Sequence, residues 1–130
     1  MEQFYELVSK IMGQFLLTNG FQVNDRKIQK SSTHCRVTYL STELEICFEE
    51  SWRNGDVLCQ VRKSSNQLED ASNVGWENFR KLIPRPRHES IEELLKRVPE
   101  IPRGSIEQLK AIRDELEVHF VSIKKALSSY

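Results

Sequence analysis

The stretch that decides the fold is CRVTYLSTELEICFEESWRNGDVLCQVRK, residues 35–63. Its apolar residues alternate with polar ones, which is typical of strands that bury a single face. Asn54-Gly55 tolerates the positive φ values of a tight type I′ turn. Earlier in the stretch, Ser41-Thr42 separates the alternating run that ends at Leu40 from the one that begins at Leu44. The stretch therefore predicts two successive β-hairpins, which together form three antiparallel strands.

The two predicted turns set a register. The expected cross-strand pairs are Trp52–Val57 and Phe48–Val61 in the second hairpin, and Tyr39–Leu44, Val37–Ile46 and Cys35–Phe48 in the first. Both hairpins place the same apolar set on one side of the sheet, namely Cys35, Val37, Tyr39, Leu44, Ile46, Phe48, Trp52, Val57, Cys59 and Val61. A shift of the register by one residue would turn this whole set toward water, so the pattern fixes which side of the sheet is buried.

The opposite side of the predicted sheet is polar. Its residues are His34, Arg36, Thr38, Glu43, Glu45, Glu49, Gln60 and Arg62, and the predicted register makes Arg36 and Arg62 flank Cys47 with the glutamates on the diagonals. One interpretation is a solvated sheet face, which is common in antiparallel sheets. The other is an acidic docking surface for a basic protein partner, formed by Glu43, Glu45, Glu49 and Asp56.

Glu50 breaks the alternation. It falls on the apolar side between Phe48 and Trp52, and the predicted register places it opposite Cys59. A buried carboxylate without a partner is costly. A bulge or the sheet end exposes Glu50, or a partner satisfies it, or its pKa is raised for a purpose.

Composition favours one domain that spans residues 1–130. The chain is 38% hydrophobic and 29% charged, and its formal net charge is zero. A balanced charge argues against a dedicated nucleic-acid-binding protein, which usually has a basic excess. No apolar run approaches the ~20 residues of a membrane span, and the start, Met-Glu-Gln-Phe-Tyr-Glu, is unlike a secretory signal. We expect a cytoplasmic protein.

Helical periodicity surrounds the predicted meander. A first helix is expected from about Glu2 to Thr18, because its apolar residues recur at a spacing of three to four. A strand follows between Phe21 and Lys30. A short helix from Val74 to about Leu82 should turn Trp76, Phe79, Leu82 and Ile83 inward.

Two capping boxes predict two further helices, Ser90-Ile91-Glu92-Glu93 and Ser105-Ile106-Glu107-Gln108. The last helix should run from Ile106 to about Leu127, and it could offer Val118, Val121 or Phe120 to a second copy in a homodimer. The predicted fold class is α+β, with an N-terminal helix, a three- to four-stranded antiparallel meander, and two to three C-terminal helices packed on one sheet face.

No catalytic or metal-binding pattern is present in the sequence. Cys35 and Cys59 are predicted on the inner face and Cys47 on the outer one, so the three thiolates cannot converge on one zinc ion. The three histidines are isolated from one another, and the sequence has no nucleophile elbow, Walker loop or dinucleotide fingerprint. We expect no cofactor. A small enzyme whose site is assembled from scattered residues stays an alternative.

A second alternative is nucleic-acid binding through residues 80–103. Its candidate residues are Arg80, Lys81, Arg85 and Arg87, and the aromatic residues Trp76 and Phe79 precede them. Basic residues beside aromatic rings can bind single-stranded nucleic acid. Glutamates interleave with these basic residues, and this favours a mixed-charge surface instead.

One layout resembles a known group of proteins. The progression Tyr39-Leu40-Ser41-Thr42-Glu43-Leu44-Glu45-Ile46, followed by an acidic strand end, a tight turn, a third strand and Trp76-Glu77-Asn78-Phe79, is similar to small bacterial α+β proteins. Some of these resemble immunity proteins encoded beside polymorphic toxins. The resemblance covers roughly residues 15–98 and transfers no functional residue. It implies a stoichiometric protein binder, and specifically one that neutralises a toxin by direct binding.

Overall fold

A computed structural model describes residues 3–64, 75–83 and 104–128 of the chain. The predicted helix that begins at Ser90, together with Arg85 and Arg87, lies outside these residues. The helices are α1 (Phe4–Thr18) and α3 (Ser105–Ser128), and a 3-10 turn, η1, spans Phe79–Leu82. The strands are β1 (Lys27–Lys30), β2 (His34–Leu40), β3 (Leu44–Ser51), β4 (Val57–Lys63) and β5 (Glu77–Asn78).

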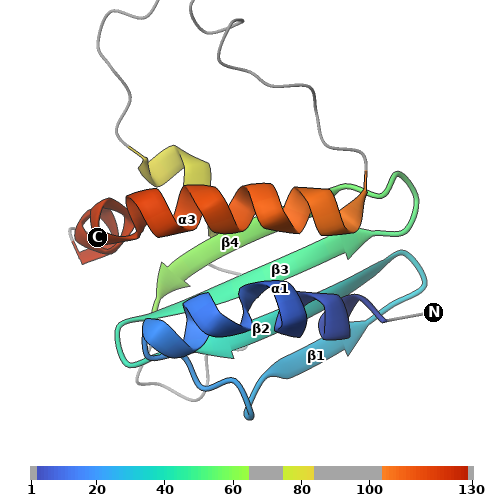
Figure 1. Ribbon diagram of the computed structural model, residues 1–130, viewed down its shortest axis with the longest axis horizontal. Helices are drawn as coiled ribbons and strands as arrows, with labels where there is room; N and C mark the ends of the chain where they lie inside the picture. Colours follow the sequence, from blue (N-terminus) through green and yellow to red (C-terminus); the bar gives the residue numbers. More distant parts are fainter. Residues whose placement is uncertain (1–2, 65–74, 84–103, 129–130) are drawn as a thin grey trace, which may run out of the picture.

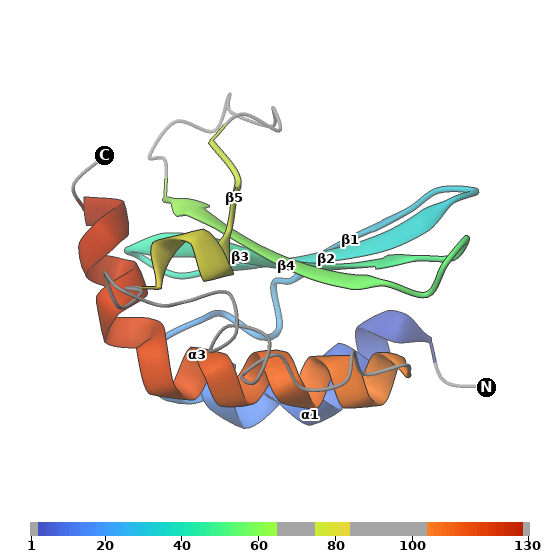
Figure 2. The same ribbon diagram turned by 90° about the horizontal axis from the view of Figure 1, so that it is seen from above.

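The strands form one antiparallel sheet in the order β1-β2-β3-β4-β5. Helices α1 and α3 lie side by side on the same face of this sheet (Figures 1 and 2). The predicted α+β class, the antiparallel meander and the placement of the first and last helices are confirmed. The sheet has five strands rather than the expected three or four, because two residues after Trp76 pair with β4.

The predicted register is wrong by two residues in both hairpins. Phe48 faces Val37 on one side and Cys59 on the other. The second turn is longer than a two-residue loop, because Ser51 N–H donates to the carbonyl of Asp56 at 2.9 Å and Gly55 N–H donates to the carbonyl of Ser51 at 2.8 Å. Gly55 alone in this turn has a positive φ, +75°. An even shift preserves the faces, so the apolar set still points inward.

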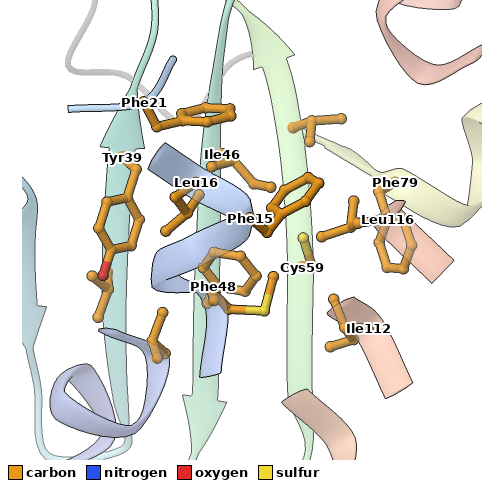
Figure 3. Packing of buried hydrophobic residues seen from close by; sticks show 14 of the residues in the cluster. Phe15, Leu16, Phe21, Tyr39, Ile46, Phe48, Cys59, Phe79, Ile112 and Leu116 are labelled. Carbon is orange, nitrogen blue, oxygen red and sulfur yellow. The ribbon is translucent and has the colours of Figure 1, made fainter. Parts of the chain in front are cut away.

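The inner face and the two helices enclose the core. Figure 3 shows Phe15 and Leu16 of α1, and Ile112 and Leu116 of α3, packed over the strand residues. The buried strand residues are Cys35, Val37, Tyr39, Leu44, Ile46, Phe48, Val57, Cys59 and Val61. Trp52 does not join them and is 50% exposed, because β3 ends at Ser51 and the turn carries Trp52 away from the pleat.

Phe120 of α3 belongs to the core and is not available to a second copy. It is 5% exposed and makes an edge-to-face contact with Phe15, with ring centroids 5.1 Å apart. Val118 and Val121 are exposed, as expected. Near α1, the predicted strand over residues 21–30 is reduced to β1, although Gln22 N–H still donates to the carbonyl of Leu40 at 2.9 Å.

Glu50 is satisfied by the start of α3. Its cross-strand neighbours are Cys35 and Val57, not the predicted Cys59, and its carboxylate accepts a hydrogen bond from the Ser105 hydroxyl. Gln108 donates to the carbonyl of Gly55 at 2.9 Å and accepts from Val57 N–H at 2.8 Å. The expected local capping box is therefore replaced by tertiary bonds, which fix the N-terminus of α3 to the β3–β4 turn.

Candidate functional site

The sheet has a second face, which neither α1 nor α3 covers. Figure 2 shows both helices on one side of the sheet, whereas the described chain at the start of β5 lies on the other side. We call this second side the outer face and define it by Arg36, Thr38, Leu40, Glu45, Cys47, Glu49, Leu58, Gln60, Arg62 and Trp76.

Trp76 lies on this outer face instead of in the core. The guanidinium carbon of Arg62 is 4.5 Å from the centroid of the Trp76 ring, and that of Arg36 is 4.9 Å from it. The chain then crosses the β4 edge, so that Phe79 and Leu82 reach the inner core as predicted. The expected helix over residues 74–82 is shortened to η1, where the Asn78 side chain accepts from Arg80 N–H at 3.0 Å.

One of the two arginines at the indole ring forms an ion pair. Arg62 on β4 lies directly opposite Glu45 on β3 and donates to its carboxylate, and the two side chains are only 12% and 16% exposed. Glu49 lies directly opposite Arg36, and its carboxylate is 3.5 Å from His34 Nε2. The expected flanking of Cys47 by two arginines is wrong, because the two-residue shift brings each arginine opposite a glutamate. One terminal nitrogen of Arg36 is buried and has no hydrogen-bond partner among the described residues.

Cys47 lies beneath this cluster and is fully buried. Burial raises the pKa of its thiol to about 11, although nearby Arg36 and a backbone hydrogen bond of Gln60 act in the opposite direction. Burial also raises the pKa of Cys35 and of Cys59 on the inner face. All three thiols are therefore protonated near neutral pH, and a protonated thiol is a poor nucleophile and metal ligand. No group of three potential metal ligands occurs among residues 3–64, 75–83 and 104–128.

The four acidic residues of the predicted docking surface do not lie together. Glu45 and Glu49 share the outer face of β3, and each faces a basic residue. Glu43 precedes β3 and pairs with Lys124 of α3 at 3.0 Å, whereas Asp56 follows the turn at the far end of β3. A continuous acidic surface would require all four side chains on one side, and the structure divides them.

The basic candidates that the structure describes are matched by carboxylates. Arg80 donates to Glu115 from two nitrogens, at 2.9 and 3.5 Å, and also lies over the Phe79 ring. Lys81 is 3.9 Å from Glu77. Binding of nucleic acid through residues 80–103 stays a prediction, because Arg85 and Arg87 fall outside the described part of the chain.

Two exposed leucines complete the outer face. Leu40 is 41% exposed opposite Glu45, and Leu58 is 44% exposed opposite Glu49. Sequence reasoning missed these leucines and also the position of Trp76. A signal existed, since Leu40 and Leu58 fall on the polar side of the alternation, where a leucine has no packing role in the fold.

No family model, curated protein or solved structure matches the chain. None of the helices in the described residues combines the length and the apolar character that crossing a bilayer requires.

Proposed function

We propose that this protein is a non-catalytic protein-binding module that holds its partner against the outer face. The observation that carries the proposal is the contact of the Trp76 ring with the guanidinium groups of both Arg36 and Arg62. Tryptophan and arginine supply much of the binding energy at protein interfaces. Here the three side chains already contact one another in the free chain, which reduces the conformational entropy that binding would cost.

The surroundings of Trp76 suit a macromolecular partner. Leu40 and Leu58 add exposed apolar surface on the same side of the sheet. Arg62 and Glu45 already satisfy each other, so covering this pair would leave no unpaired charge at the interface. A charge left unpaired in an interface is what makes burial of ionic groups costly.

Neutralisation of a toxin by direct binding is the specific form of this function that we propose. The resemblance of residues 15–98 to immunity-type proteins favours it. A neutralising protein needs no reactive group of its own, and the buried, protonated thiols of Cys35, Cys47 and Cys59 agree with such a role. In this form, Glu45 and Glu49 would contribute to the encounter with a basic partner, and the rate of association would fall with added salt.

A pair of matched variants tests the binding surface. Leu58→Arg places a bulky cation on the outer face, next to Glu49, whereas Leu17→Arg makes the same change on α1, where Leu17 is 63% exposed. The wild-type protein and the Leu17→Arg variant should capture the same partner from the native host in a 1:1 ratio, and Leu58→Arg should lose it. Equal capture by both variants would show that the outer face is not the binding surface.

The toxin-neutralising form has its own test. The captured partner is expressed alone and then together with this chain. The proposal expects that the partner alone stops growth, and that co-expression of wild-type protein, but not of Leu58→Arg, restores it. A captured partner that is not toxic would contradict toxin neutralisation but not the function as a protein-binding module.

A further inference from the structure

Strand β1 forms one edge of the sheet. All four of its residues, Lys27–Lys30, are exposed, and it lies at the end of the strand order next to β2 (Figure 1). Ile28, the one apolar residue of this strand, is 37% exposed.

The phase of the β1–β2 ladder tells which backbone groups point outward. Ser31 N–H donates to the carbonyl of His34 at 2.9 Å, and hydrogen-bonded pairs recur every second residue in an antiparallel ladder. The register pairs Gln29 with Arg36, two residues along each strand from the Ser31–His34 bond, so Gln29 and Arg36 are also a hydrogen-bonded pair. The N–H and C=O groups of Ile28 and Lys30 therefore point away from β2, and no strand of the described chain pairs with them.

Unneutralised positive charge accompanies this edge. Arg26 and Lys30 both lie against the ring of Tyr5, at 5.8 and 4.8 Å from its centroid, and Lys30 Nζ is 3.4 Å from the neutral Gln3 amide oxygen. Neither of these two residues nor Lys27 forms an ion pair with a carboxylate of the described residues. Arg62, Arg80 and Lys124, by contrast, are each paired with a glutamate.

We propose that β1 accepts an extended acidic peptide segment as an additional strand. The free backbone groups of Ile28 and Lys30 would supply the ladder bonds, and Lys27, Lys30 and Arg26 would select the charge. The same lysines disfavour a second copy of this chain, because pairing two β1 edges would bring their positive charges close together. None of the residues that define the outer face belongs to β1, so the inference goes beyond the proposed function.

A designed peptide is the probe. A fluorescein-labelled Glu-Val-Glu-Thr-Glu-Val-Glu peptide is titrated with the protein at about 20 mM salt, where screening is weak. Saturable binding is expected, and exchange of the Ile28 and Lys30 amide hydrogens should slow in the complex. A lysine version of the peptide, and an acidic version with proline at its centre, should bind at least tenfold more weakly. The absence of binding by the acidic peptide overturns the proposal.

Variants of β1 separate strand pairing from simple charge attraction. Ile28→Pro removes an outward N–H without breaking a bond to β2, and proline is tolerated at such edge positions. It should weaken binding at least tenfold, whereas Ile28→Thr should keep binding within about threefold of wild type, because it retains the N–H. If Ile28→Pro does not fold, the proline-containing peptide makes the same test with unaltered protein.

Charge reversal supplies the matched control. Lys27→Glu with Lys30→Glu should abolish peptide binding, whereas Lys63→Glu with Lys110→Glu, which change the net charge equally at exposed positions away from β1, should not. If neither Ile28→Pro nor the proline in the peptide weakens binding, charge alone explains the binding and the proposal is contradicted. A dimer of the free protein that Lys27→Glu dissociates would also contradict the proposal, because a second copy would then occupy the β1 edge. Loss of peptide binding in Leu58→Arg would show that the peptide binds the outer face. That result would overturn this inference without overturning the proposed function.

Discussion

The two faces of the same sheet differ in what holds them. On the inner face, Val37, Ile46 and Phe48 have no exposed surface and pack under α1 and α3. On the outer face, Trp76 is held by two guanidinium groups, and exposed leucines lie beside ion pairs. Burial of apolar side chains therefore stabilises the inner face, whereas a few specific contacts order the outer face, which stays partly exposed.

The largest expected effect tests the inner face. Phe48→Ala should lower the free energy of unfolding by about 3–5 kcal/mol, because it removes a buried ring and leaves a cavity beside Tyr39. Leu58→Ala on the outer face should cost less than about 1 kcal/mol. Urea denaturation followed by circular dichroism measures both values, and equal losses would contradict the division between the faces.

Alkaline pH probes the buried thiol beneath the outer face. The pKa of Cys47 rises from 9.0 to about 11 in the folded chain, mainly through burial. The folded state therefore holds this proton to higher pH than the unfolded state, so stability is fully present below pH 9 and falls as pH rises toward 11. The loss should be about 2–3 kcal/mol, at about 1.4 kcal/mol for each pKa unit.

Cys47→Ala is the control for this pH dependence. Urea denaturation under reducing conditions at successive pH values should show a smaller alkaline loss in this variant. The remaining loss would come from Tyr39 and the inner-face thiols, because burial also raises the pKa of Tyr39, Cys35 and Cys59. An unchanged pH profile would show that Cys47 does not titrate as described.

Loss of the hydrogen bond between Ser105 of α3 and Glu50 of the sheet should have an intermediate effect on the free energy of unfolding. Ser105→Ala leaves the Glu50 carboxylate without its hydroxyl donor on the inner side of the sheet, and should cost about 2 kcal/mol. Glu50→Gln in the same background should recover part of this loss, since a neutral amide is easier to bury. A cost below about 0.5 kcal/mol for Ser105→Ala would show that water satisfies Glu50 instead.

A smaller effect than at Ser105 is expected at Trp76. Trp76→Ala removes two cation–π contacts on a half-open surface and should cost about 1–2 kcal/mol. It should also uncover Cys47, which then reacts with a thiol reagent at least tenfold faster than in wild type. Trp76→Phe keeps an aromatic ring and should restore most of the protection. Unchanged Cys47 reactivity in Trp76→Ala would show that the ring does not cover the thiol.

Alternation along residues 35–63 was sufficient to predict the sheet and its buried face. Register was not, because the turn at Asn54-Gly55 is longer than the dipeptide suggests, as the backbone hydrogen bonds from Ser51 to Asp56 and from Gly55 to Ser51 show. The partner of Glu50 also could not be predicted, since Ser105 lies 55 residues away in sequence. Trp76 was misplaced for a related reason, because its aromatic character fits a core as well as a sheet surface flanked by arginines.

Photo-crosslinking in the native host, from the outer face and from α1, tests directly whether a partner binds the outer face. A photoreactive phenylalanine analogue replaces Leu58 on the outer face or Leu17 on α1, each of them exposed in the free chain. We expect one adduct of a single additional mass from position 58 and none from position 17. An adduct from position 17 alone, or from neither position, would contradict a partner bound to the outer face.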